Sequence, residues 1–272
     1  MLEDHFTFLG FRDYEMVGEG KERALRLVSH SGLGVLRDHT HSKMLRQYSD
    51  LPEQARKIAL SAEQILIISK TNTLSTVHRP AYTDYIGVKR FNDTGELIGE
   101  RRFIGLYTSV AYGGDPKAIP ILRHKVDSVL SRSKLPPMSH AGKDLTHILA
   151  NLPRDDLFHA TEDELYELSM AILHLQERRQ IRLFVRKDAY GRFMSCLVYV
   201  PRENFNTTLV NRIQEILRKS FKGLDVSFTT YFSESVLARI HYVIRVDPRK
   251  KLNYDVKKIE KKLIEVGESW ED

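Results

Sequence analysis

Residues 181–221 constrain the fold of this chain more than any other stretch, because two strand patterns are followed there by one helix pattern. Apolar and polar residues alternate at the start of residues 181–191, as in a half-buried strand, and turn-forming residues come next. Residues 193–200 are apolar at nearly every position, which predicts an interior strand. Asn206 or Thr207 can cap the helix that follows, which has a single apolar stripe.

The next residues repeat this order of elements. Residues 224–232 and 238–246 alternate as two more strands, and apolar residues recur at helical spacing after Pro248. The predicted order is therefore ββαββα. Two hairpins joined by a right-handed crossover form one antiparallel sheet with both helices on one face, which is a ferredoxin-like sandwich.

The second face of this sheet is predicted to be open and basic. The alternation places on it the side chains of Arg182, Phe184, Arg186, Tyr231, Arg239, His241 and Arg245. An open basic face is typical of a surface that contacts another domain, subunit or ligand. The candidate contact residues are Arg182, Arg239, His241 and Arg245.

The chain before residue 181 divides into two segments of different periodicity. Residues 1–114 are rich in strand patterns, with a strong hairpin turn at Asn92 to Gly95, and we expect a β-rich module there. Residues 115–180 have helical periodicity, with Ser139 as a helix cap and a capping box that starts at Thr161. We therefore predict an α+β protein with a β-rich module at 1–114, a helical connector at 115–180 and the sandwich at 181–272.

Composition favours a protein with ordinary packed cores in a reducing cytoplasm. The hydrophobic and charged fractions, 42% and 29%, are typical of globular proteins, and the charge of +6 comes mostly from bases interleaved with acids. The single cysteine, Cys196, lies in the most apolar strand and is expected to be buried. Strand-like sequence begins within a few residues of Met1, which predicts a segment of a longer protein.

The sequence lacks the motifs of the common catalytic and cofactor sites. It has no phosphate-binding loop, no nucleophile elbow, no zinc-protease helix motif and no cysteine pairs. The glycines at 32 and 34 lack the third glycine of a dinucleotide site, and His39 and His41 lack further metal ligands at a defined spacing. We therefore predict no catalytic, cofactor-binding or metal-binding residues.

Two polar clusters are candidates for an effector contact. His78, Arg79 and Asp84 surround a proline, and Arg79 can bind Asp84, the backbone or an external anion. A catalytic site built from the same three residues is a further hypothesis. The second cluster is the start of the helix after Pro201, where free backbone amides near Arg202, Asn206 and Thr207 can receive a carboxylate.

Four stretches of the chain resemble a known family. These stretches are HFTFLGFRDY, STVHRPAYTDYIGVKRF, GERRFIGLYTS and LHLQERRQIRLFVRKDAYGRFMSCLVYVPRENFNT. They are similar to the N-terminal regulatory region of the bacterial large-subunit NAD-specific glutamate dehydrogenases. The resemblance implies a PAS-like portion for the β-rich module and an ACT-like domain at 181–272. The usual ACT order is βαββαβ, so here the terminal strand has moved to the front.

The resemblance implies a non-catalytic regulatory and assembly segment. The parent enzyme would use NAD to convert L-glutamate to 2-oxoglutarate and ammonia in a different region, while this segment would bind no cofactor. Its partners would be other domains and subunits of a homo-oligomeric cytoplasmic enzyme, and a small allosteric effector such as an amino acid. The alternative is a nucleic-acid-binding module that stacks bases on Phe184 and Tyr231 of the open sheet.

Overall fold

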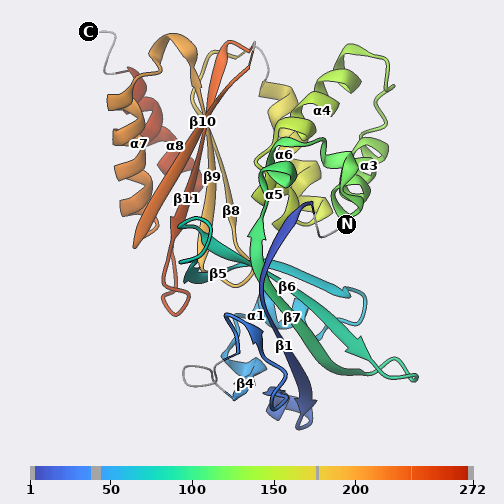
Figure 1. The fold of residues 1–272 in the computed structure, drawn as a ribbon. Helices are drawn as coiled ribbons and strands as arrows, with labels where there is room; N and C mark the ends of the chain where they lie inside the picture. Colours follow the sequence, from blue (N-terminus) through green and yellow to red (C-terminus); the bar gives the residue numbers. More distant parts are fainter. Residues whose placement is uncertain (1–3, 38–43, 176–177, 234, 269–272) are drawn as a thin grey trace. The chain divides into compact units, whose positions relative to one another are not determined.

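A computed structural model describes residues 4–37, 44–175, 178–233 and 235–268 (Figure 1). The chain forms two compact units, Met1–Ile119 and Pro120–Asp272. Each unit contains α-helices and one antiparallel sheet. The predicted α+β class is therefore confirmed.

The first unit is built on a curled, half-open sheet of long strands (Figure 1). The strands are β1 (Phe6–Val17), β2 (Ala24–Leu27), β3 (Leu33–Gly34), β4 (Leu45–Gln47), β5 (Leu66–Leu74), β6 (Tyr82–Phe91) and β7 (Leu97–Tyr107). Their order is β4-β2-β1-β7-β6-β5, and β3 pairs with β1. Two short helices, α1 (Glu53–Leu60) and α2 (Ser109–Gly113), accompany the sheet.

The predicted hairpin turn joins β6 to β7. The side-chain oxygen of Asn92 accepts hydrogen bonds from the backbone N–H groups of Thr94 at 3.1 Å and Glu96 at 2.8 Å. Gly95 has a φ of 82°, a left-handed conformation that glycine adopts without steric cost. The local chemistry of this turn therefore helps to set the register of β6 and β7.

Gly34 allows a close contact between two strands. Gly34 has a φ of 59° and lies in β3, where a Cβ atom would come within 2.1 Å of the carbonyl oxygen of Leu9 in β1. Only a residue without a side chain allows β3 to approach β1 this closely. This contact accounts for the position of Gly34 without any nucleotide.

The chain leaves the sheet between β5 and β6. β5 ends at Leu74, and residues 75–81 form a tight turn closed by a 2.8 Å hydrogen bond from Ser75 N–H to Ala81 C=O. His78 has a φ of 65°, which is incompatible with a strand.

The second unit begins with four helices. They are α3 (Pro120–Ser133), α4 (His140–Asn151), α5 (Arg154–His159) and α6 (Glu162–Leu175). The predicted caps are confirmed: Ser139 accepts from Gly142 N–H at 3.1 Å, and Thr161 and Glu164 exchange hydrogen bonds of 3.2 and 2.8 Å. The sequence patterns did not predict the short helix α5, because a six-residue helix has too few turns to show a period.

The rest of the second unit follows the predicted ββαββα order. The elements are β8 (Arg182–Lys187), β9 (Phe193–Pro201), α7 (Thr207–Ser220), β10 (Asp225–Phe232), β11 (Leu237–Arg245) and α8 (Val256–Glu268). The sheet has four strands in the order β10-β11-β9-β8. In Figure 1, α7 and α8 lie on one side of this sheet, and α3–α6 lie on the other. The core under α7 and α8 includes Met194, Val198, Ile213, Ile240 and Leu263.

The prediction of an open second sheet face is wrong. Helices α4 and α5 contact this face, where the backbone of Asn151 and the carboxylate of Asp156 bind side chains of the sheet. β9 is accordingly buried at nearly every position, on both of its faces. The face on which nucleic-acid bases would stack is thus covered by the unit's own helices, and this removes the basis of the nucleic-acid alternative.

Candidate functional site

The most polar part of the covered face is a buried cluster around Asp156. One carboxylate oxygen of Asp156 accepts hydrogen bonds from Arg186 Nη2 at 2.6 Å and Nε at 3.1 Å. The other oxygen accepts from the Ser195 hydroxyl at 2.9 Å, and this hydroxyl lies 2.9 Å from His241 Nε2. Helix α5, strands β8 and β9, and strand β11 each contribute to this Asp156 cluster. The cluster therefore ties the helices to the sheet.

The charges of the Asp156 cluster are matched. Burial by itself would raise the pKa of Asp156, but the charge of Arg186 and the hydrogen bonds from Arg186 and Ser195 outweigh it, and the pKa is lowered. Burial would likewise lower the pKa of Arg186, but Asp156 raises it above its usual value. Burial lowers the pKa of His241, so the imidazole is neutral at pH 7. The cluster is one buried ion pair with two neutral hydrogen-bonding neighbours.

The geometry of the cluster differs from that of a catalytic Ser-His-Asp triad. In a triad, the two ring nitrogens of the histidine face the serine and the aspartate separately. Here the same atom, His241 Nε2, lies 2.9 Å from Ser195 Oγ and 3.6 Å from the Asp156 carboxylate. All three residues are also less than one-tenth exposed. Ser195, His241 and Asp156 therefore have a structural role and lack the geometry of a catalytic triad.

Lys125 of α3 fastens the end of α5. Its ammonium group donates hydrogen bonds to the carbonyl oxygens of Leu157, Phe158 and Ala160 at 3.0, 2.8 and 2.7 Å. A cation at the C-terminus of a helix satisfies carbonyls that have no partner within the helix. Burial lowers the pKa of Lys125 to about 8.

This lowered pKa predicts a measurable pH dependence of stability. The folded chain loses the proton of Lys125 near pH 8, whereas the unfolded chain keeps it to a pH of about 10.4. Between these values the unfolded state binds more protons, so the free energy of unfolding contributed by Lys125 rises with pH. We therefore compare the native chain with Lys125→Met. The free energy of unfolding of the native chain minus that of the variant should rise by up to about 1.4 kcal/mol per pH unit from pH 8 to pH 10.

Urea unfolding followed by circular dichroism at pH 8, 9 and 10 measures this difference. Lys258→Met, at an exposed position of α8, is the matched control and should show no such trend. A difference between the native chain and Lys125→Met that stays constant over this range contradicts the assignment.

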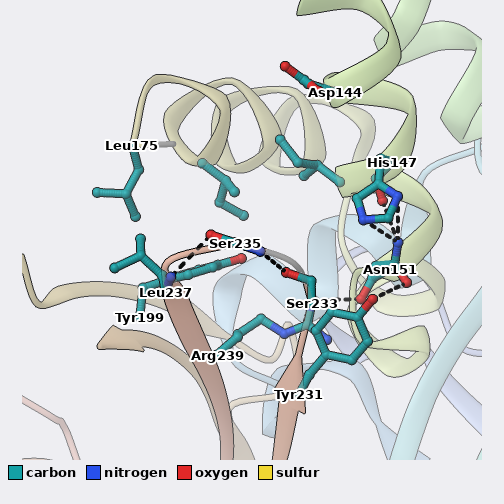
Figure 2. A pocket seen from close by; sticks show the side chains of 12 residues that line it. Asp144, His147, Asn151, Leu175, Tyr199, Tyr231, Ser233, Ser235, Leu237 and Arg239 are labelled. Carbon is teal, nitrogen blue, oxygen red and sulfur yellow. Dashed lines mark hydrogen bonds between the residues drawn. The ribbon is translucent and has the colours of Figure 1, made fainter. Parts of the chain in front are cut away.

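A pocket lies between the helices and the sheet of the second unit (Figure 2). Its volume is about 120 Å³. Helices α4 and α6 line one side, and strands β9, β10 and β11 line the other. The lining residues are Asp144, His147, Ile148, Asn151, Ile172, Leu175, Tyr199, Tyr231, Ser233, Ser235, Leu237 and Arg239. Its wall is mainly apolar, which is typical of sites for small molecules.

Arg239 is the cationic residue of the pocket wall that the sequence had already selected. Its Nη1 donates a 2.6 Å hydrogen bond to the carbonyl oxygen of Asn151, the last residue of α4. The centre of the Tyr231 ring lies 4.5 Å from the guanidinium carbon, and the Tyr231 hydroxyl donates to the side chain of Asn151 at 2.7 Å. The structure thus brings Arg239 and Tyr231 together at the end of α4.

The other residues predicted on this face do not line the pocket. His241 belongs to the Asp156 cluster. Arg182 pairs instead with Glu260 of α8 at 3.3 Å, across the edge of the sheet. Arg245 is half-buried at the far end of β11. Cys196 is buried as expected, and its burial raises the pKa of the thiol.

Two of the three residues predicted as an anion site at the start of α7 bind the chain's own groups. The Asn206 side chain accepts from Leu209 N–H at 2.9 Å, as the capping prediction required. Arg202 donates to the carbonyl oxygen of Ser233 at 2.9 Å, and Thr207 is exposed. These three residues do not converge on a shared ligand position.

Of the three residues His78, Arg79 and Asp84, the structure brings Arg79 and Asp84 together at the backbone of Tyr107. Arg79 donates to the backbone carbonyl oxygen of Tyr107 at 2.8 Å, which is the backbone link considered from the sequence. Asp84 is fully buried, pairs with Lys70 at 2.9 Å and accepts from Tyr107 N–H at 3.1 Å. His78 is exposed on the turn. The cluster fastens a turn to β7, and this does not support the hypothesis of a catalytic site there.

Besides the pair of Lys70 and Asp84, the first unit contains a buried ion pair between Arg102 and Glu100. Arg102 donates to Glu100 Oε1 from Nε at 3.2 Å and from Nη2 at 3.1 Å, and the Tyr85 hydroxyl also donates to Glu100. The guanidinium carbon of Arg102 lies 4.4 Å from the Tyr14 ring centre and 4.9 Å from that of Tyr85. Burial opposes the charge of Arg102, but Tyr85 and Glu100 raise its pKa well above the ordinary value.

The described residues contain neither a candidate metal site nor a candidate membrane-spanning helix. No group of three or more histidine, cysteine, aspartate or glutamate side chains there could hold a metal ion. His39 and His41 lie outside the described residues. No helix of the described chain is both long and apolar enough to cross a membrane.

Sequence reasoning missed Asp156, Asn151 and the apolar wall of the pocket. One signal was available: residues 193–200 are apolar at consecutive positions, as in strands covered on both faces. That run predicts a second cover over the sheet. It does not identify α4, α5 and α6 as the elements that provide the cover.

Comparisons with known proteins divide the second unit into a helical region and a sheet region. Residues 182–271 match the family described as "Glutamate dehydrogenase, ACT2 domain", and residues 119–178 match "Glutamate dehydrogenase, helical motif 1". The sheet side of the pocket therefore lies in the first of these regions, and the helical side lies in the second.

Whole-chain relatives extend the match to the first unit. The chain is 40% identical over 272 residues to an NAD-specific glutamate dehydrogenase of Halomonas elongata, and 39% identical over 276 residues to one of Pseudomonas aeruginosa. It is 30% identical over 249 residues, 90% of the chain, to one of Mycobacterium tuberculosis. The chain spans only 17% of the length of the first two and 14% of the third. The resemblance seen in the sequence is thereby confirmed.

Proposed function

The chain belongs to the NAD-specific glutamate dehydrogenase family, and we propose that it is a non-catalytic regulatory and assembly segment of such an enzyme. The parent enzyme would oxidise L-glutamate to 2-oxoglutarate and ammonia in the cytoplasm, with NAD bound in another region. The partners of this segment would be other domains and subunits of a homo-oligomer.

We also infer the finer domain assignment. Residues 1–114 would be a PAS-like module, residues 115–180 a helical connector, and residues 181–272 an ACT-like domain with a ferredoxin-like sandwich. The ββαββα order and the four-stranded sheet with α7 and α8 on one face support the last of these.

The observation behind the regulatory proposal is the composition of the pocket wall. Helices α4 and α6 belong to the helical motif, and β9, β10 and β11 belong to the ACT2 domain, so a ligand in the pocket would contact both. An effector changes the arrangement of two regions only if it binds one arrangement more tightly. A ligand that contacts both regions would bind more tightly to the arrangement in which both sides of the pocket reach it.

The test is a pocket-filling variant of the full-length dehydrogenase that contains this segment. Ile148 is half-buried in the pocket wall, so Ile148→Trp would fill the cavity with little change to the core. We expect the glutamate concentration that gives half of the maximal rate of glutamate oxidation to change by about fivefold or more, which is a usual size for coupling between sites. The measurement is initial-rate kinetics.

Met138→Trp is the control, because Met138 is 80% exposed and lies outside the pocket wall. It should leave the kinetics unchanged. Unchanged kinetics in Ile148→Trp would contradict a regulatory role of the pocket. Glutamate oxidation by the purified segment alone would contradict the assignment of the segment as non-catalytic.

A further inference from the structure

We propose that the pocket of the second unit binds a small carboxylate with an apolar body, and that Arg239 binds its carboxylate group. This inference rests on the proposed effector role of the pocket and names the chemical class of the ligand. It follows from the unmatched hydrogen-bonding capacity of Arg239 and from the chemistry of the surrounding wall.

Arg239 has a donor and a charge without a matching acceptor. Its Nε is buried and has no hydrogen-bond partner among the described residues, and no ion pair involves Arg239 in that part of the chain. The carbonyl oxygen of Asn151, which binds Nη1, and the hydroxyl of Tyr199, which also forms a hydrogen bond with the Arg239 side chain, are both uncharged partners. A guanidinium has five N–H donors arranged to bind a carboxylate with two parallel hydrogen bonds.

Other arginines of the same sheet show what Arg239 lacks. Arg186 binds Asp156 at 2.6 Å, and Arg182 binds Glu260 at 3.3 Å. Buried charges in proteins are normally paired, because removing a charge from water is costly unless an opposite charge compensates. A ligand carboxylate in the pocket would give Arg239 a negatively charged partner of the same kind.

The rest of the pocket wall suits an uncharged, apolar body. Ile148, Ile172, Leu175 and Leu237 contribute the apolar surface. The volume of about 120 Å³ approaches that of cavities of about 150 Å³ that hold benzene. The ligand should therefore have an apolar group no larger than a phenyl ring.

The polar groups near Arg239 are compatible with an anion. Burial raises the pKa of Tyr199, so its hydroxyl keeps a proton that it can donate to a carboxylate. Figure 2 shows Asp144 at the opposite side of the pocket from Arg239. The guanidinium end of the pocket therefore favours negative charge.

Isothermal titration calorimetry on the whole chain tests this inference with four probes. Benzoate has both required groups, benzyl alcohol lacks the charge, benzylamine has the opposite charge, and acetate lacks the ring. We expect benzoate to bind at least about tenfold more tightly than each of the others, as is usual for a hydrogen-bonded charged group. Equal affinities for benzoate and benzyl alcohol would overturn the assignment to a carboxylate.

Variants then test the role of Arg239 itself. Arg239→Gln should weaken benzoate binding at least about tenfold and leave benzyl alcohol binding unchanged, which a purely structural role would not do. Arg182→Gln is the matched control and should bind benzoate like the native chain. If Arg239→Gln does not fold, Ile148→Trp should abolish benzoate binding while its circular dichroism spectrum stays native. Benzoate binding that survives either folded pocket variant contradicts the inference.

Failure of this inference and failure of the proposed function give different results. Benzoate binding to the chain, with no kinetic effect of Ile148→Trp in the full-length enzyme, would support the carboxylate site and reject its regulatory role. A kinetic effect of Ile148→Trp, with benzoate binding no tighter than benzyl alcohol, would support the regulatory role and reject the carboxylate.

Discussion

Asp156→Ala is expected to lower the free energy of unfolding of the second unit by about 3–5 kcal/mol. The substitution removes the carboxylate but leaves the Arg186 guanidinium in a place where its side chain is only 15% exposed. It also removes the acceptor of the Ser195 hydroxyl. A buried charge that loses its partner retains the full cost of its removal from water, and this cost makes the effect large.

Urea unfolding followed by circular dichroism measures the loss. Asp163→Ala is the matched control: Asp163 also pairs with an arginine, at 2.7 Å, but its side chain is 81% exposed. We expect this control to lose less than about 1 kcal/mol, because water screens exposed ion pairs. Equal losses in the two variants would show that burial does not set the strength of the Asp156 pair.

A double substitution separates the cost of an unpaired charge from the value of the pair. Replacing both partners, as in Asp156→Leu with Arg186→Met, leaves no buried charge behind. Apolar replacements of similar volume are often neutral for buried ion pairs, so we expect the double variant to recover most of the stability lost in Asp156→Ala. A double variant as unstable as Asp156→Ala would assign the loss to packing.

Glu100→Ala is the second substitution with a large expected effect, and it acts on the first unit. Glu100 and Arg102 have side chains that are 5% and 10% exposed, and Tyr85 donates to the same carboxylate. The variant leaves Arg102 buried between two aromatic rings without a counter-charge. We again expect a loss of about 3–5 kcal/mol in the free energy of unfolding.

Hydrogen exchange followed by mass spectrometry assigns this loss to the correct unit. Amide protection should fall in β1, β6 and β7 and stay unchanged in β9 and β11, since the units are compact bodies of their own. Glu53→Ala is the control, because it removes an ion pair with Lys57 in which the Glu53 side chain is 71% exposed. It should leave the amide protection of both units unchanged. Loss of protection in both units would contradict a local effect.

Local features of this protein were predictable because neighbours in the sequence decide them. The turn at Asn92 to Gly95, the caps at Ser139 and Asn206 and the capping box at Thr161 each involve residues within four positions of one another. The ββαββα order followed from periodicity, which reports burial along each element. Arg239 was selected because alternation places it on the second sheet face.

The candidate site required contacts between distant residues. Arg186 meets Asp156 across 30 residues of sequence, His241 meets Ser195 across 46, and Arg239 meets Asn151 across 88. Alternation along a strand shows that a side chain faces one way, but it does not show what lies opposite. For this reason the second face of the sheet, which carries several arginines, was predicted to be open, although α4 and α5 cover it.

The amino-acid sequence by itself determined which segments become helices and strands and where most of them end, because hydrogen-bonding caps and apolar periodicity are local properties. Only the tertiary structure decided that the helices before residue 181 cover the second face of the sheet. That choice depends on whether Asp156, Asn151 and the apolar residues of α4 and α6 match the charges and shape of the strands opposite. Such a match is a property of two surfaces in contact and is absent from either segment alone.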